Sequence, residues 1–322
     1  MLHRRKFLNL GASAVLMPAV ASGARAQSYP ARPVHVLVGY AAGSASDIIV
    51  RLMAQHLSEQ LGQQFVVENR PGAATNLAAG DAARATPDGY TLLLASSANT
   101  VNATLYNNLT FDLGTDLVPI ALIDVVPYVL EVNPSLPAKT VAELIAYAKA
   151  NPGKINMASQ GIGSGPHVAG ELFQMMTGVK FVHVPYTGTP YADLIAGQVQ
   201  LMFSPIPASI AYVKSGQLRP LAVASPSRLA ILPDLPTVAE TVPGFDASGW
   251  HGLTAPKGTP GQVIEAINKA ANADLADAGF KAKLTDLGGI PTPMSAAEFG
   301  KFITDDIQKW AKVIKFADIK PS

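Results

Sequence analysis

Cysteine is absent from the 322 residues of the chain, and no run of apolar residues is long. Without cysteine the chain has no disulfide, no cysteine nucleophile and no site for lipoprotein acylation. The apolar run at residues 7–20 spans about 14 residues, short of the roughly 20 that cross a bilayer as a helix. We therefore expect a protein that is not embedded in a membrane and that is stabilised by its core alone, which a chain of this length can bury.

Charge is scarce and nearly balanced. The chain has 24 lysine and arginine residues against 23 aspartate and glutamate residues, a formal net charge of +1. No basic stripe is present, so nucleic acid is not expected as a partner. An anion would have to be bound locally, by backbone dipoles or by one or two side chains.

The motifs of common enzyme classes are missing. There is no G-x-S-x-G elbow and no G-x-x-x-x-G-K-[ST] phosphate loop. Residues 161–166 have Pro166 where a dinucleotide fingerprint requires glycine or alanine. The six histidines are not clustered at metal-ligand spacing. We expect no enzyme, no cofactor and no metal, although a lyase or isomerase with dispersed carboxylates stays open as an alternative.

The N-terminus is typical of an export signal. Basic residues 4–6 (RRK) precede the apolar run, and residues 24–26 (ARA) form the small-x-small pattern of a signal peptidase site. We predict a signal peptide over residues 1–26, cleaved after Ala26, and a periplasmic location. The apolar pair after the two arginines favours the twin-arginine route, with an ordinary Sec signal as the alternative. Cleavage removes four of the 24 basic residues and no acid, leaving 20 against 23, a net charge near −3.

Short strands alternate with helices in the first part of the mature chain. Apolar runs predict strands at residues 34–39, 65–68 and 90–95. Between the first two, we expect a helix that is capped by Ser46 or Asp47 and ends at Gly62. A further helix is expected to run through Ala85. This order predicts a mainly parallel α/β sheet.

The same order recurs in the middle of the chain. Strands are predicted at residues 155–158, 181–184 and 199–203, with small-residue loops at 159–165 and 185–190 and helices at 166–176 and 191–196. The two halves share this order of elements rather than a sequence repeat.

The last third predicts a return to the first unit. We expect strands at 218–224 and 249–253, an extended Pro-rich segment at 226–243 with one short helix, and amphipathic helices at 260–278 and 296–317. The organisation is therefore predicted as a discontinuous lobe 1 at residues 27–127 and 246–322, and a central lobe 2 at residues 128–245.

The small-residue loops lie where ligands bind in parallel α/β sheets, beyond the carboxyl ends of the strands. Helix N-termini there offer unpaired N–H groups and a partial positive charge to an anion. Hydroxyls would orient the ligand, and the candidates are Ser44, Ser46, Ser159, Ser164, Thr187 and Thr189.

Several residues near these loops have two interpretations each. Asp47 is either a helix cap or a contact for an amine on the ligand. Asp193 is either a favourable charge in a first helical turn or a ligand contact. His167 stands in a first turn beside a candidate loop and could bind a ligand. Arg70 could pair with a carboxylate or brace the loop, while Trp250 is expected in the core or the wall of a cleft.

Five strings resemble one family. They are residues 38–47 (VGYAAGSASD), 67–73 (VENRPGA), 87–92 (PDGYTL), 184–188 (VPYTG) and 194–199 (LIAGQV), the last followed by Met202 and Phe203. Their order and spacing resemble the Bug family of extracytoplasmic receptors for tripartite tricarboxylate transporters, also called TctC-like, over essentially the whole mature chain.

The resemblance implies an α/β, two-lobed periplasmic-binding-protein (Venus-flytrap) fold, type II-like, with two crossovers and a final helix that spans the lobes. It implies a small organic carboxylate ligand, a tripartite membrane transporter as partner and a monomer. Carried over to this sequence, together with the loop reasoning, it gives candidate ligand-binding residues. They are Tyr40, Ala41, Ala42, Gly43, Ser44, Ser46, Asp47, Ser97, Ser159, Gly161, Gly163, Ser164, His167, Tyr186, Thr187, Gly188, Thr189 and Asp193.

Three departures from the family pattern concern the ligand. Tyr40 stands where the family often has proline or phenylalanine, residues 187–190 (TGTP) stand in place of a Gly-rich run, and residues 73–75 (AAT) replace a more Gly-rich segment. All three are expected to line the cleft. The alternatives to transport are a sensor-input protein that signals carboxylate availability and a periplasmic enzyme that acts on a carboxylate.

Overall fold

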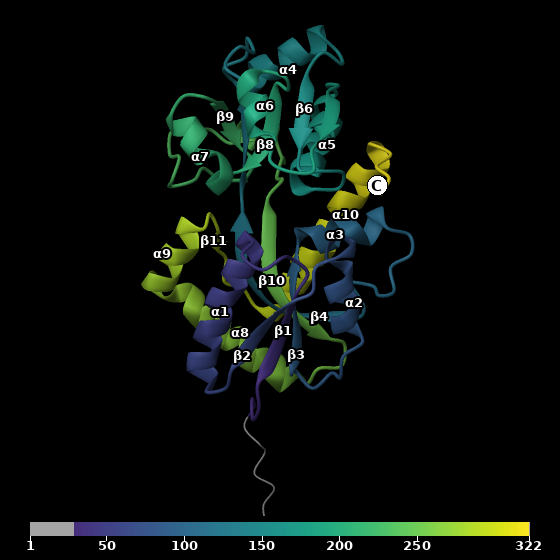
Figure 1. Cartoon of the computed structure of the whole chain (residues 1–322), viewed down its shortest axis with the longest axis vertical. Coiled ribbons are helices and arrows are strands. Elements are labelled where there is room, and N and C mark those ends of the chain that lie inside the picture. The colour runs from purple at the N-terminus through teal and green to yellow at the C-terminus, as the bar shows by residue number, and fades with distance from the viewer. Residues whose placement is uncertain (1–28, 322) are drawn as a thin grey trace, which may run out of the picture.

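The computed structural model describes residues 29–321 as two α/β lobes, one above the other in Figure 1. The predicted signal peptide and its cleavage site after Ala26 lie outside the described residues. Within residues 29–321, no helix is both long enough and apolar enough to cross a membrane.

Lobe 1 is built on a six-stranded sheet in the order β11-β4-β10-β3-β1-β2. Three strands, β1, β2 and β3, are parallel, whereas β10 is antiparallel to both β3 and β4, and β11 is antiparallel to β4. The strands are β1 (Val34–Val38), β2 (Phe65–Asn69), β3 (Thr91–Ser96), β4 (Leu117–Val126), β10 (Gly249–Pro256) and β11 (Ile290–Pro291).

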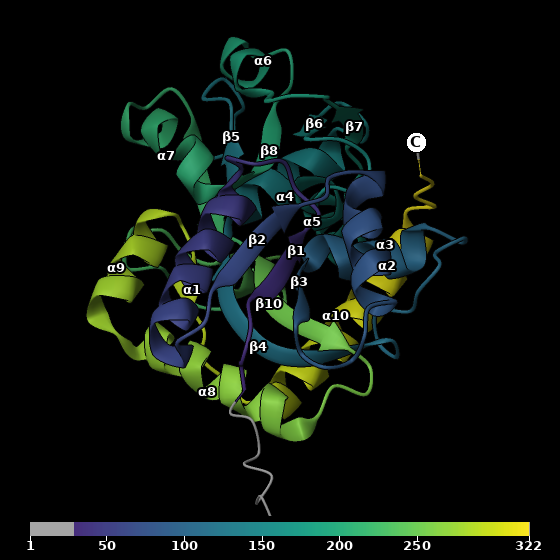
Figure 2. The ribbon, with the colours of Figure 1, turned by 60° about the horizontal axis from the view of Figure 1, so that its bottom comes forward.

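Helices cover both faces of this sheet, as Figure 2 shows. One core cluster joins β1 and β4 to α1, α8 and α9, and another joins β3 and β10 to α2 and α10. The helices are α1 (Ala45–Leu61), the 3-10 turn η1 (Ala73–Thr75), α2 (Asn76–Ala83), α3 (Ser97–Leu105), α8 (Gly261–Ala276), α9 (Ala278–Asp286) and α10 (Ala296–Phe316).

Lobe 2 has a five-stranded sheet in the order β7-β6-β8-β5-β9, with β5 antiparallel to its neighbours. Helices α4 and α5 pack on one face, and α6 and α7 on the other. The strands are β5 (Tyr128–Val132), β6 (Asn156–Ser159), β7 (Val182–Pro185), β8 (Leu201–Pro205) and β9 (Arg219–Val223). The helices are α4 (Val141–Ala150), α5 (Gly165–Thr177), α6 (Tyr191–Ala196), α7 (Ile206–Lys214) and the turn η2 (Val238–Glu240).

The chain crosses between the lobes twice, from β4 into β5 and from the segment after η2 into β10. The crossing strands are paired where they meet, with Gly249 opposite Val126. Helix α10 makes a third link, because Phe299 packs in lobe 1 while Trp310 and Val313 join the lobe 2 core. Figure 1 shows α10 running from lobe 1 to end beside α5.

The predicted order of strands and helices is found, with two differences. Both sheets are mixed rather than mainly parallel, because β10 and β5 insert antiparallel. Helix α1 is capped by Ser44 and not by Ser46 or Asp47, since the Ser44 hydroxyl accepts from the Asp47 N–H at 3.3 Å. Helix α1 therefore starts at Ala45, two or three residues earlier than a cap at Ser46 or Asp47 would place it.

Candidate functional site

A cavity of about 570 Å³ lies between the lobes. Its wall includes Tyr40 and Ser97 from lobe 1 and Tyr128 and Ser164 from lobe 2. A cavity of this volume is in the range that binds a small molecule.

Four helices begin at the cavity wall. In lobe 1 these are α1, at Ser44 to Ser46, and α3, at Ser96 to Ala98; in lobe 2 they are α5, at Gly163 to Pro166, and α7, at Pro205 to Ala208. Each start leaves backbone N–H groups without helical partners and adds a partial positive charge. Two lobes thus direct four such starts at one space, an arrangement suited to an anion.

Side-chain cations do not add to this charge. Among the wall residues, all within the described part of the chain, none is lysine or arginine. Much of the remaining wall is apolar, formed by Ile49, Val101, Val126, Val168, Trp250, Leu287 and Trp310. The site therefore combines backbone dipoles for a charged group with an apolar surface for a carbon skeleton.

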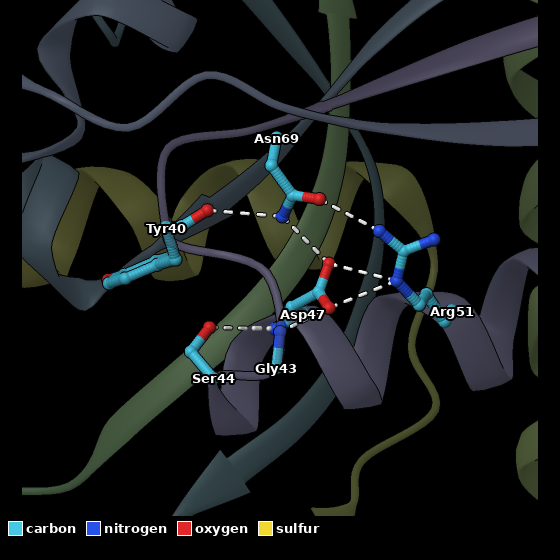
Figure 3. A network of polar contacts seen from close by, with 6 residues as sticks. All are labelled: Tyr40, Gly43, Ser44, Asp47, Arg51 and Asn69. Carbon is cyan, nitrogen blue, oxygen red and sulfur yellow. Dashed lines mark hydrogen bonds and ion pairs between the residues drawn. The ribbon is translucent and has the colours of Figure 1, made fainter.

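The loop before α1 is held by Asp47, which is 2% exposed. Its carboxylate accepts from the Gly43 N–H at 2.9 Å, from Asn69 at 2.7 Å and from Arg51 at 3.0 Å (Figure 3). Asn69 also donates to the Tyr40 carbonyl. Burial alone would raise the pKa of Asp47, but the hydrogen bonds from Arg51, Gly43 and Asn69 outweigh it and hold the pKa below its ordinary value.

A second set of contacts reaches the cavity through β10. The Ser46 hydroxyl lies 2.8 Å from His251 Nε2, and His251 Nδ1 lies 2.8 Å from Asp124 Oδ1. Ser46 and His251 line the cavity, while Asp124 is fully buried behind them in β4. The three residues come from α1, β10 and β4. The contact between His251 and Asp124 exists because β10 and β4 are paired in the sheet, with these two residues opposite each other.

In lobe 2, the loop before α5 is held by two histidines. The Gly163 N–H donates to His167 Nδ1 at 3.0 Å, and the Ser159 hydroxyl lies 2.6 Å from His183 Nε2. The two imidazole rings stack, with centroids 3.7 Å apart. Burial lowers the pKa of His167 to about 3, with a further contribution from His183, and burial lowers the pKa of His183 to about 4. Both rings are therefore neutral near pH 7.

Six of the predicted site residues line the cavity: Tyr40, Ser44, Ser46, Ser97, Gly163 and Ser164. Others support the wall from behind, since Asp47, His167 and Ser159 are buried and hydrogen-bonded to loop atoms. The remainder lie outside the wall, at Ala41, Ala42, Gly43, Gly161, Tyr186, Thr187, Gly188, Thr189 and Asp193. Their ligand contact stays a prediction.

Sequence reasoning missed the start of α7, the contact between His251 and Asp124, and Trp310. The start of α7 has proline in its first turn, as α5 does, so Pro207 repeats a signal that Pro166 already gave. His251 and Asp124 are 127 residues apart, and no local pattern links them. Trp310 lies on α10, where its helical spacing reads as ordinary core.

Arg70, by contrast, has a purely lobe 1 role in this structure. Its guanidinium pairs with Glu68 at 3.0 Å and with Asp81 at 2.9 Å. It braces the surface after β2 rather than the cavity.

Two lobes, two chain crossings and an anion-suited cavity between them define a two-lobed solute-binding protein of the periplasmic-binding-protein fold. The chain matches the family model TctC, described as tripartite tricarboxylate transporter family receptor, over residues 49–319, and it belongs to this family. This is a family of periplasmic solute-binding proteins and not of enzymes.

Individual relatives agree. The chain is 36% identical over 301 residues to protein BugT of Bordetella pertussis (strain Tohama I), covering 92% of each. It is similar to the structure of R. palustris Rpa4515 with adipate, at 36% identity and a TM-score of 0.77, over 91% of this chain and 100% of that one. MatC (Rpa3494) from Rhodopseudomonas palustris with bound malate is 30% identical, with a TM-score of 0.73, over 89% and 100% of the two chains.

Proposed function

We propose that the protein captures a small organic carboxylate in the cavity between its lobes and delivers it to a membrane transporter of the tripartite tricarboxylate type. The observation that carries this proposal is that four helices, two from each lobe, begin at the same cavity. None of the residues that line the cavity within residues 29–321 is lysine or arginine. Each start contributes about 0.3–1 kcal/mol to an anion nearby, and more when the site is partly buried.

The shape of the wall supports an acid with an apolar body. Trp250, Trp310 and Val101 offer apolar area between the polar helix starts. Two relatives were solved with adipate and with malate, which are both small dicarboxylates. We expect a ligand of similar size here.

Closure of the lobes is part of the proposal. We assign residues 27–127 and 246–322 to lobe 1, and residues 128–245 to lobe 2, supported by the membership of the two sheets. The paired crossing strands at Val126 and Gly249 would then act as the hinge. The closed pair of lobes would present the surface that the transporter recognises, and a single chain suffices for this.

A thermal-shift screen of the mature protein against organic acids tests the binding function. A ligand at about 100 times its Kd stabilises the folded state by about 2.7 kcal/mol, which raises the melting temperature measurably. The matching carboxamides are the control, since they keep the size and lose the charge. The proposal fails if no carboxylate raises the melting temperature at millimolar concentration, or if the amides raise it equally.

The proposal includes export by the twin-arginine route, with cleavage after Ala26. N-terminal sequencing of the exported protein is then expected to begin at Gln27. Replacing both Arg4 and Arg5 by lysine should leave the precursor in the cytoplasm, while export that continues unchanged would favour the Sec route.

A further inference from the structure

Ser46 lies in the cavity wall and begins a chain of hydrogen bonds that runs through His251 to Asp124. The helix starts to which we assign the carboxylate do not depend on this chain. Ser46 is 8% exposed, His251 9% and Asp124 0%. Besides His251 Nδ1, Asp124 Oδ1 accepts from the His251 backbone N–H at 3.2 Å. Asp124 Oδ1 therefore contacts both the backbone N–H and the ring Nδ1 of His251, and the other ring nitrogen, Nε2, faces Ser46.

The position of Asp124 at one end of this chain sets the direction of each hydrogen bond. A carboxylate oxygen only accepts, so the Nδ1 of His251 must donate to Asp124. In the neutral ring the proton then stands on Nδ1, and Nε2 is left as an acceptor. The Ser46 hydroxyl donates its single hydrogen to Nε2, and only its oxygen lone pairs remain for the cavity.

We propose that Ser46 is a specificity-determining acceptor, which takes a hydrogen bond from a hydroxyl of the ligand, so that the cleft prefers hydroxycarboxylates to the same acids without the hydroxyl. This inference rests on the proposed function. The carboxylate is held by the helix starts, and the hydroxyl points at Ser46 Oγ. A carboxylate oxygen at that position would meet lone pairs instead of a donor.

The order of serine, histidine and aspartate is also that of a hydrolytic triad. The family consists of binding proteins, and we assign the chain of contacts to recognition. Other charged groups near β10 are engaged elsewhere: Asp306 accepts from the Trp250 indole at 2.9 Å and pairs with Lys309, and Asp47 pairs with Arg51.

The test compares matched acids by isothermal titration calorimetry on the mature protein at pH 7.5. The pairs are succinate and malate, glutarate and 2-hydroxyglutarate, and adipate and 3-hydroxyadipate, with both enantiomers of each hydroxy acid. In every pair in which one member binds, the better enantiomer of the hydroxy acid is expected to bind roughly three- to tenfold more tightly, the contribution of one neutral hydrogen bond.

Three variants locate the effect. Ser46→Ala should bring the affinity ratio of each pair close to one, and Ser46→Thr, which keeps the hydroxyl, should preserve the ratio. Ser58→Ala is the matched control, because Ser58 lies on the same helix α1 but outside the cavity wall, with its hydroxyl donating to the Ala54 carbonyl. It should leave the ratio as in the parent protein.

The outcomes separate the two proposals. If no carboxylate binds, in these titrations or in the thermal-shift screen, the proposed function is contradicted. If acids bind but no pair favours the hydroxy acid, or if Ser46→Ala keeps the preference, only the present inference is overturned.

A direct measurement of the proton position avoids any effect of the variants on folding. Nitrogen-15 NMR of the imidazole at pH 7.5, with His251 assigned by its loss in His251→Gln, should show the proton on Nδ1 and none on Nε2. A protonated Nε2 would make Ser46 a donor to the cavity and overturn the inference.

Discussion

In lobe 1 the buried acids that support the site each have a nitrogen partner, whereas in lobe 2 the buried acid Glu131 is bonded to one hydroxyl. Asp47 pairs with Arg51, and Asp124 pairs with His251. Glu131 in β5 is fully buried and accepts from the Ser204 hydroxyl, and its Oε2 has no partner among the described residues. The two lobes therefore bury carboxyl groups in opposite electrostatic settings.

This difference extends to the loops that form the site. The lobe 1 loop before α1 is fixed by a charged network, while the lobe 2 loop before α5 is fixed by neutral histidines and hydroxyls. Charge-assisted hydrogen bonds are stronger than neutral ones and depend on the acid staying ionised. We expect lobe 1 to hold its half of the site near and above pH 7, and lobe 2 to be the lobe whose stability responds to pH.

Breaking the lobe 1 network should have the largest effect. Asp47→Ala removes a buried carboxylate that accepts from Arg51, Asn69 and the Gly43 N–H. At about 1.5–3 kcal/mol for each hydrogen bond to a charged group, the loss should be about 3–5 kcal/mol. Urea denaturation should show this loss, and acid binding should weaken because the loop before α1 is no longer held. The control is Asp305→Ala, which removes an exposed pair with Lys301 and should cost less than about 1 kcal/mol. Equal losses in the two variants would contradict the account.

Removing the charge of the buried acid in lobe 2, Glu131, should stabilise the protein, whereas removing Asp47 from lobe 1 destabilises it. Burial raises the pKa of Glu131 to about 7, partly offset by the hydrogen bond from Ser204. The folded pKa lies above the unfolded value near 4.5, so stability is full below pH 4.5 and is lost as pH rises through 7.

Glu131→Gln cannot ionise, so it should match the parent protein near pH 4.5 and exceed its stability by about 3 kcal/mol at pH 8. Denaturation of both proteins at the two pH values measures this difference. If the variant is no more stable than the parent protein at pH 8, ionisation of Glu131 does not reduce the stability of the fold, and the prediction is wrong.

The stacked histidines should make lobe 2 sensitive to acid. Both folded pKa values, about 3 for His167 and about 4 for His183, lie below the unfolded value near 6.5. Stability is therefore full above pH 6.5 and is lost as pH falls through 4. His183→Gln keeps a partner for Ser159 and removes the second ring, so it should reduce this loss by about 2 kcal/mol at pH 4, allowing for partial exposure. An unchanged acid slope would exclude His183 as its source.

A smaller effect is expected where the lobes touch. Gly288 in lobe 1 stands at φ 82°, and a Cβ there would collide with Pro207 of lobe 2. Gly244 has the same φ of 82°, with open space around it. Both alanine variants carry about 1–2 kcal/mol of backbone strain, but only Gly288→Ala should hold the lobes apart and weaken acid binding, by about tenfold. If calorimetry shows the same affinity for both variants, close approach of Gly288 to Pro207 is not required for the lobes to close.

Local patterns predicted most elements because each depends on its own residues. Helix 191–196 and the strands near 34, 65 and 91 were placed within one or two residues. The two crossing strands were harder, since β4 and β5 form one apolar stretch interrupted at Pro127, and the antiparallel insertion of β10 depends on partners far along the chain. Helix α9 begins two residues after α8 ends and was not predicted.

The parts of the site that lie in loops at helix starts could be predicted from the sequence. The parts that depend on which strands lie side by side in the sheet could not. Ser44, Ser46 and Ser164 follow strands at helix starts, which is a local signal. The contact between His251 and Asp124 exists only because β10 lies beside β4, so no spacing in the sequence encodes it. The same limit applies to Ser159, whose hydroxyl is bonded to His183 from the next strand.

The central claim, a carboxylate bound between closing lobes, is most directly tested by intrinsic fluorescence. Both tryptophans of the chain, Trp250 and Trp310, line the cavity, so the emission reports on this site alone. Titration with the acid that gives the largest thermal shift should change the emission saturably with one site per chain, and its carboxamide should not. An emission that stays constant while that acid binds, or an equal response to the carboxamide, would contradict the account.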